Sequence, residues 1–258
     1  MEILTFDLVG KMAHFRKYYA NNTAMSFTIP PRTALMGILA SIMGLPRDSY
    51  YKDFSSDNLK FGIRILQPVK KSFHRLNMLM IKGEKDFQGR QGHTQTPFEV
   101  VTGLNIRTDE VRYRIYLTNS GAINPGIFQD CAAKLLSLNA VYAVTFGVAN
   151  FTAQVINVRL IHSNDWAKLE FEKPGSVRVH SAIPSERVTG INPVLGKLNL
   201  EEELLPANFI ENYKRELTSP MWRVLFSTDG KPMEIQAEGS FYELKYGAEQ
   251  SEIITFLD

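Results

Sequence analysis

Hydrophobic and polar positions along the chain follow two periods, and their order predicts an α+β fold. Alternation with a period of two is typical of half-buried strands, and it occurs at residues 2–9, 59–69, 111–118, 143–148 and 154–160. Helical spacing predicts a helix that begins near Pro31 and ends at Gly44. A second helix is predicted at about 125–138. This order of elements is that of a ferredoxin-like domain of the RRM type.

Residues 70–102 interrupt the pattern. The segment is basic, and its middle is rich in glycine (Gly83, Gly89 and Gly92) between strand-like flanks at 75–81 and 95–101. So long a stretch without a core pattern inside a compact domain is usually functional or mobile. We therefore expect a β-hairpin that protrudes from the domain.

The C-terminal third has a different character. Short strands are predicted at 177–183, 222–227, 233–237, 241–246 and 253–257, with an acidic segment at 201–215. We expect a ferredoxin-like domain over residues 1–162 and a small β-rich domain over 163–258.

Charge is distributed unevenly, although the formal net charge is only +2. Residues 1–116 contain 17 Lys and Arg against 10 Asp and Glu, whereas residues 117–258 contain 12 against 17. The most basic part is 60–116, which includes the expected hairpin. A basic segment in a nearly neutral protein predicts a confined site for a polyanion.

Few kinds of catalytic chemistry fit the sequence. The five histidines lack metal-ligand spacing, and the single cysteine, Cys131, is expected to be a buried core residue. Phosphate-binding glycine loops, dinucleotide fingerprints and serine-hydrolase elbows are absent from the sequence. We expect no metal site and no cofactor. A metal-independent ribonuclease needs only a His or Tyr base beside a cation, so His74 or His93 leaves that alternative open.

The expected location is the cytoplasm, without a membrane partner. Glu2 and Asp7 occupy positions where a signal peptide would be basic, and no apolar run reaches the length of a membrane span.

RNA binding is better supported by the residue pattern. Cations contact the phosphates of single-stranded RNA, and aromatic rings stack on its bases. Arg32 is the strongest single phosphate candidate, because it stands at a predicted helix N-terminus, where free N–H groups favour anions. The predicted RNA-binding residues are Arg16, Lys17, Tyr18, Tyr19, Phe27, Arg32, Thr33, Lys70, Lys71, Arg75, Lys82, Arg90, Gln91, His93, Gln95 and Phe98.

Four stretches resemble the CRISPR-associated Cas5 family in its type I-B form. The longest is FTIPPRTALMGILA at 27–40, followed by GLPRDSYY at 44–51. The stretches QTPFEVV at 95–101 and VTFGVANF at 144–151 agree in order and spacing. Together they span about residues 27–151.

The resemblance implies a RAMP-type domain whose hairpin is a thumb, in a non-catalytic subunit of a type I Cascade complex for antiviral defence. Such a subunit binds the five-prime handle of the CRISPR RNA (crRNA) and caps the backbone filament. The implied partners are the Cas7 filament subunit, the Cas8 large subunit and, through the complex, target DNA. In the I-C subtype the family member cuts precursor RNA, so an endoribonuclease acting on CRISPR repeats is the alternative.

Overall fold

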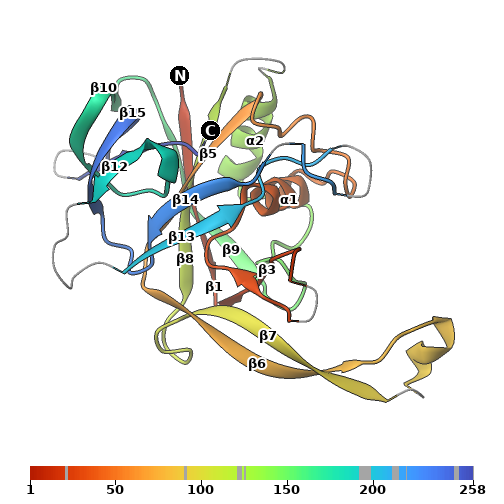
Figure 1. Ribbon diagram of the computed structural model, residues 1–258. Coiled ribbons are helices and arrows are strands. Elements are labelled where there is room, and N and C mark those ends of the chain that lie inside the picture. The colour runs from red at the N-terminus through yellow and green to blue at the C-terminus, as the bar shows by residue number, and fades with distance from the viewer. Residues whose placement is uncertain are drawn as a thin grey trace.

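The chain folds as a mostly β protein, in a computed structural model that describes residues 1–258 apart from 21–22, 90–91, 121–123, 125, 192–198, 211–214, 219, 247–249 and 258. The helices in the described part are α1 (Arg32–Met43), α2 (Gly126–Leu136) and the short 3₁₀ turns η1 (Glu84–Gln88) and η2 (Ser185–Arg187). The strands (Figure 1) are β1 (Ile3–Gly10), β2 (Met12–Ala13), β3 (Phe15–Arg16), β4 (Ser26–Phe27), β5 (Leu59–Ile65), β6 (Val69–Leu79), β7 (His93–Gly103), β8 (Val111–Asn119), β9 (Ala153–Ile161), β10 (Trp166–Val179), β11 (Ile183–Pro184), β12 (Val188–Ile191), β13 (Leu200–Leu205), β14 (Trp222–Ser227), β15 (Met233–Lys245) and β16 (Ser251–Ile254).

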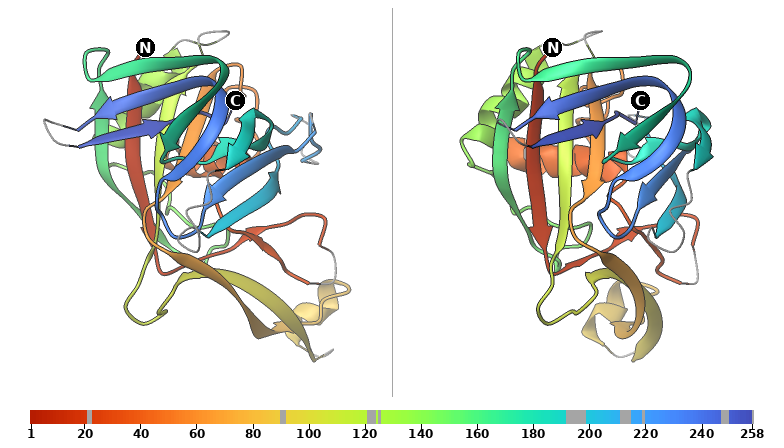
Figure 2. Two further views of the ribbon diagram at one scale, coloured as in Figure 1. Left: turned by 60° about the vertical axis from the view of Figure 1, so that its left-hand side comes forward. Right: turned by 90° about the vertical axis from the view of Figure 1, so that its left-hand side faces the viewer.

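A four-stranded antiparallel sheet in the order β5-β8-β1-β9 forms the centre of the molecule. Helix α1 lies between β1 and β5 in the chain, and α2 lies between β8 and β9. Figure 2 shows α1 behind this sheet and the C-terminal strands β15 and β16 across its other face. Both faces of β1 are therefore covered, which explains why seven of its eight residues are buried.

The C-terminal strands share the core of the N-terminal half. Leu205, Phe226 and Leu257 belong to the same buried cluster as Phe6 of β1. On the other face of the central sheet, Ile3 packs in a cluster with residues of β15 and β16. The division at residues 162/163 stays a prediction, and the packing joins the two parts through continuous apolar contacts.

The clearest local predictions are confirmed. Helix α1 ends at Gly44, which has a φ of +79° and donates its N–H to the carbonyl of Ala40; this left-handed cap favours glycine. Helix α2 lies within the predicted range. Cys131 on α2 is fully buried, and burial raises the pKa of its thiol to about 12, as expected for a core cysteine.

Other predictions are wrong in detail. Residues 143–148 form a tight loop with an isolated bridge between Thr145 and Thr152 instead of a strand. The predicted strands 233–237 and 241–246 are one strand, β15, which bends through Gly239 at a φ of +100°. The predicted strand 177–183 covers only the end of β10, because the first ten residues of β10 are all exposed or intermediate.

Gly147 in the 143–148 loop is predicted to be essential for stability. Its φ is +88°, and a Cβ atom there lies 2.0 Å from the carbonyl oxygen of His14. Gly147→Ala is therefore expected to lower the free energy of unfolding by about 3 kcal/mol or more, measured by urea denaturation. Gly83→Ala is the control, because a Cβ at Gly83 meets nothing within 4 Å. Equal stability of the two variants would contradict this role of the loop.

Candidate nucleic-acid interface

Strands β6 and β7 form a long two-stranded hairpin that projects from the body (Figure 1). Their register runs from Val69 opposite Gly103 to Leu79 opposite His93. The tip is ordered by Asp86, whose carboxylate accepts hydrogen bonds from the N–H groups of Lys82 (2.7 Å) and Gly83 (2.9 Å). The predicted flank 95–101 is thus part of the longer strand β7, and the flank 75–81 overlaps β6, which begins earlier and ends at Leu79.

The outer part of the hairpin exposes both cations and large apolar side chains. A two-stranded ribbon has no core of its own in which to bury them. Phe87 at the tip is 72% exposed and Phe73 on β6 is 58% exposed. Other exposed apolar side chains are those of Leu76, Met78, Leu79 and Ile81. Exposed cations of the hairpin are Lys70 near its base, Arg75 in the middle of β6, and Lys82 and Lys85 at the tip. Apolar surface left open in this way marks an interaction surface.

The base of the hairpin is held by acidic residues of β13. Lys71 on β6 forms ion pairs with Glu201 and, at 3.2 Å, with Glu203. Burial alone would lower the pKa of Lys71, but the two carboxylates outweigh it and raise that pKa, so the lysine stays charged. Lys17 forms an ion pair with Glu203 at 2.9 Å. These lysines were predicted to bind RNA, and the structure instead places them in contacts within the protein.

The aromatic loop, residues 14–28, is tied to both the hairpin and β13. His14 stacks on Phe98 of β7 at 4.0 Å and its Nδ1–H donates to the carbonyl of Glu99 at 2.7 Å. Burial lowers the pKa of His14 and favours this neutral ring. The N–H of Thr28 donates to Glu203 Oε2 at 2.8 Å. The loop is therefore a defined platform.

Two tyrosines of this platform face solvent. Tyr18 is 51% exposed and Tyr19 is 50% exposed, and their ring centroids lie 5.5 Å apart in an edge-on arrangement. Arg16 beside them is exposed. In contrast, Phe27 is fully buried and Phe98 nearly so. The prediction that Phe27 and Phe98 contact RNA is therefore wrong, because core packing occupies both rings.

Arg32 also differs from its prediction. Its side chain is buried beneath the start of α1 and donates to the carbonyls of Phe54 (2.8 Å) and Leu59 (2.5 Å) and to Asn208 Oδ1 (3.0 Å). A guanidinium that satisfies backbone carbonyls inside the protein is not available to a phosphate. Arg32 thus joins α1 to the loop that follows it.

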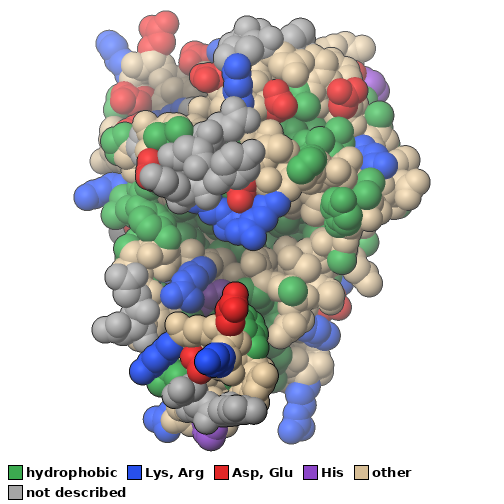
Figure 3. All heavy atoms as spheres, turned by 90° about the vertical axis from the view of Figure 1, so that its right-hand side faces the viewer, with side chains coloured by type: hydrophobic (Ala, Val, Ile, Leu, Met, Phe, Trp, Pro, Cys, Tyr) green, Lys and Arg blue, Asp and Glu red, His purple; other side chains and the backbone are tan. Residues whose placement is uncertain are grey.

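A groove of about 620 Å³ runs beside the first turns of α1. Arg16, Tyr18 and Thr33, all predicted site residues, line it together with Tyr50 and Arg215. Figure 3 views the face toward which the hairpin points, with Lys and Arg side chains on both the hairpin and the body. The structure thus brings part of the predicted set into one concave surface.

Sequence reasoning missed Arg215, which lies in the acidic segment 201–215. Its guanidinium contacts Asp48 Oδ1 at 3.1 Å, and the hydroxyl of Tyr51 donates to the same carboxylate at 2.5 Å. Burial opposes ionisation of Asp48, but the hydrogen bonds from Tyr51 and Arg215 hold its pKa below the usual value. No local motif signals a pair separated by 167 residues.

The remaining predicted residues fall into two groups. His93 and Gln95 lie on the exposed part of β7. Arg90 and Gln91 lie outside the described residues.

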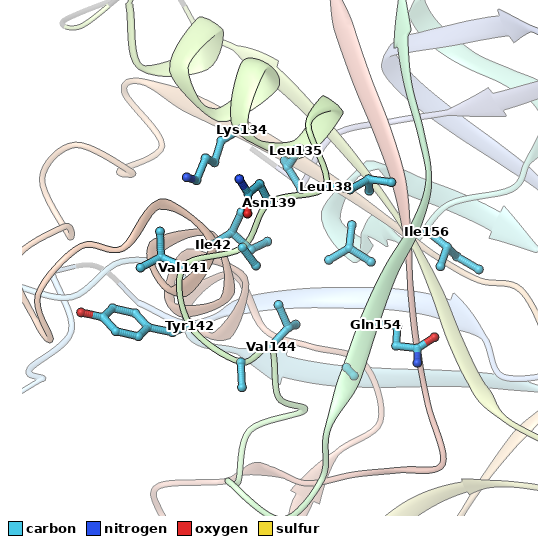
Figure 4. Close-up of a pocket in the computed structure, with 14 residues that line it drawn as sticks. Ile42, Lys134, Leu135, Leu138, Asn139, Val141, Tyr142, Val144, Gln154 and Ile156 are labelled. Carbon is cyan, nitrogen blue, oxygen red and sulfur yellow. The ribbon is translucent and has the colours of Figure 1, made fainter.

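A separate cavity of about 460 Å³ lies beside α2 and β9. Figure 4 shows mainly apolar side chains around it, including Leu135, Val141 and Val144. None of the predicted RNA-binding residues lines it.

Among the described residues, no group of three or more His, Cys, Asp and Glu side chains could hold a metal ion. The same part of the chain contains no helix that is both long and apolar enough to span a bilayer.

Comparison with known proteins finds a family match for the N-terminal part of the chain. A family model described as CRISPR-associated protein (Cas_Cas5) matches residues 3–118, the part of the chain from β1 through the hairpin to β8. This N-terminal part of the chain is similar to the CRISPR-associated Cas5 family. No curated protein matches it.

Many solved structures match this chain, and two examples follow. A CRISPR protein from Archaeoglobus fulgidus aligns with a TM-score of 0.56 and 13% identity over 100% of both chains, which shows a shared fold. A chain from a structure described as a CRISPR RNA-guided surveillance complex aligns with a TM-score of 0.49 and 14% identity over 91% of each chain.

The ion pairs at the hairpin base predict a structural role for Glu203. Glu203→Gln removes the charge that compensates two partly buried lysines, and we expect it to lower the free energy of unfolding by about 2–3 kcal/mol. Urea denaturation measures this loss. The control is the neighbour Glu202→Gln, because Glu202 lies 3.8 Å from Arg223 on the surface and such pairs contribute about 0–1 kcal/mol. A loss no larger than that of the control would show that the base is held by other contacts.

Proposed function

We propose that this chain is a non-catalytic subunit of a type I CRISPR Cascade effector complex that binds the five-prime handle of the crRNA and caps the backbone filament. The similarity of its N-terminal part to the Cas5 family supports a CRISPR role. The single observation that carries the RNA-binding proposal is the projecting hairpin, with exposed cations and apolar side chains beside the Arg16–Tyr18 groove. Phosphate contacts and base stacking are what single-stranded RNA requires.

The ferredoxin-like, RAMP-type interpretation of the N-terminal part is supported by topology. The chain order β1-α1-β5-β8-α2-β9 and the sheet order β5-β8-β1-β9 agree with a βαββαβ unit in which the hairpin is inserted between the second and third strands. On this interpretation the hairpin is the thumb.

The proposed partners are the crRNA, the Cas7 filament subunit, the Cas8 large subunit and target DNA held by the complex. The type I-B assignment rests on the sequence resemblance, and the location remains the cytoplasm.

The hairpin can mark the boundary between handle and guide. Separating adjacent bases costs a few kcal/mol, and apolar or aromatic groups against the unstacked faces offset that cost. Phe73 and Phe87 supply exposed rings, and Lys70, Arg75 and Lys82 supply phosphate contacts along the same ribbon. Lys17 and Lys71 contribute to this interface by fixing the base of the ribbon.

Salt dependence of binding tests this interface. Lys70→Gln, Arg75→Gln and Lys82→Gln combined are expected to weaken binding to repeat-derived RNA. The slope of log K against log salt should fall by about 0.7 for each lost phosphate contact, or about 2 in total. A triple Gln variant of Lys168, Lys173 and Arg178, all exposed on β10, is the matched control. An unchanged slope in the hairpin variant, or an equal change in the control, would contradict the proposed interface.

The non-catalytic part of the proposal has its own test. The hydroxyl of Ser72 lies 3.2 Å from His74 Nε2 on the open face of the hairpin, and His93 is exposed on β7. We expect His74→Ala and His93→Ala to leave crRNA maturation in cells unchanged, as followed by northern blotting. Accumulation of uncut precursor in either variant, together with metal-free cleavage of repeat RNA by the isolated protein, would support the endoribonuclease alternative.

A further inference from the structure

A polar pocket of about 480 Å³ lies on the face of the central sheet that is turned away from the helices. Four strands of the sheet line it through Thr5 of β1, Arg64 of β5, Arg114 of β8 and Arg159 of β9, and β16 closes it with Glu252. Figure 2 shows the C-terminal strands lying across this face. None of the residues assigned to the RNA interface lines this pocket.

Arginines are concentrated here by the strand register. Arg64 lies directly opposite Arg114 in the β5–β8 pair, and Arg114 lies opposite Asp7 in the β1–β8 pair. Like charges directly opposite each other destabilise a sheet. Glu252 offsets this repulsion, because its Oε1 accepts from Arg64 at 2.5 Å and from Arg114 at 2.8 Å.

Both carboxylates of the cluster are already engaged. Asp7 accepts two hydrogen bonds from Arg114, at 2.7 and 3.1 Å. The second oxygen of Glu252 accepts from the hydroxyls of Tyr116 (2.5 Å) and Tyr246 (3.3 Å). Among the residues that the structure describes, three arginines face two carboxylates here, which leaves one positive charge without compensation.

The uncompensated cation is Arg159. Its guanidinium forms no hydrogen bond or ion pair with any residue that the structure describes, and it lies 5.9 Å from the centroid of the Tyr246 ring. The side chain is exposed at the pocket. Its five N–H donors are thus available to a ligand.

The sheet is distorted at this place. The β1–β9 register shifts between Thr5 and Asp7, where β9 carries one extra residue. Asn157 at this bulge has a φ of +54°, and its side-chain amide donates to Asp7 at 2.9 Å. Bulges re-aim side chains and occur beside functional sites, and strained backbone of this kind costs about 1–3 kcal/mol. The hydrogen bond from the Asn157 amide to Asp7 offsets part of this backbone strain.

His180 adds a neutral donor. Its Nδ1 lies 3.0 Å from the N–H of Ile253 and 3.3 Å from the carbonyl of the same residue. The shorter contact, in which the N–H can only donate, favours the tautomer with the ring proton on Nε2. Burial, reinforced by the charge of Arg64, lowers the pKa of His180 and keeps the ring neutral. The pocket can therefore present an N–H donor without adding another charge.

We propose that this pocket binds the phosphate group of a small phosphorylated molecule, held by Arg64, Arg159 and His180. These residues come from three different segments and line the same pocket, and Arg64 keeps a buried Nε–H without a hydrogen-bond partner among the described residues, beside its bond to Glu252. A tetrahedral phosphate, with three strong acceptor oxygens and a charge of about −1.5 to −2, matches such a set better than a planar carboxylate, which suits a single bidentate arginine. The volume accommodates a nucleotide as well as free phosphate.

Calorimetric titration of the full chain with adenosine monophosphate, inorganic phosphate, adenosine and citrate tests the proposal. We expect adenosine monophosphate and phosphate to bind, and adenosine and citrate not to bind. Tighter binding of the nucleotide would indicate a nucleotide as the source of the phosphate, and equal binding would indicate free phosphate. Binding of neither phosphate compound, or equal binding of citrate, overturns the proposal.

Arg159→Gln is expected to weaken phosphate binding at least tenfold. Because Arg159 is exposed and forms no ion pair with described residues, the variant should unfold at the wild-type temperature. Lys173→Gln on β10 is the control, because Lys173 is exposed and does not line the pocket, and it should leave phosphate binding unchanged. Wild-type phosphate affinity in Arg159→Gln overturns the proposal. The proposal is also overturned if Arg159→Gln weakens the binding of RNA and leaves the binding of phosphate unchanged.

Discussion

A single buried carboxylate, that of Glu203, joins three segments that are far apart in the sequence. Its oxygens accept the N–H of Thr28 and pair with Lys17 and Lys71, so the aromatic loop, the base of the hairpin and β13 meet at one point. A buried carboxylate is stable only if its charge is compensated and its lone pairs are filled. The two lysines are therefore needed inside the protein, and the outer part of the hairpin is left for a ligand.

The hairpin beyond this anchor cannot stabilise itself. It is a two-stranded ribbon whose apolar side chains have no layer to pack against, and Phe73 and Phe87 remain exposed. It is held together by the backbone hydrogen bonds between β6 and β7 and by the hydrogen bonds that Asp86 accepts at the tip. An arm whose strands are already paired can bind an extended nucleic acid with less ordering than an unpaired loop, which lowers the entropic cost of binding.

The sequence predicts a helix or strand correctly where a local signal, such as hydrophobic periodicity or a capping glycine, is enough to define it. Helix α1 follows from its periodicity and from the need for glycine at Gly44, and the hairpin follows from the loss of a core pattern. The site is predicted less well, because residue type does not reveal burial. Arg32 looks like a phosphate ligand until its contacts with Phe54 and Leu59 are known. Arg215 reaches the groove through a pairing across 167 residues that no local pattern records.

Photo-crosslinking of the protein to repeat-derived RNA, with the crosslinked peptides identified by mass spectrometry, tests the central claim most directly. The account predicts crosslinks at exposed rings of the platform and the arm, namely Tyr18, Tyr19, Phe73 and Phe87, and none at the buried rings of Phe27 and Phe98. Crosslinks confined to residues outside the loop and the hairpin would contradict it, and so would strong crosslinks at Phe27 in a folded protein.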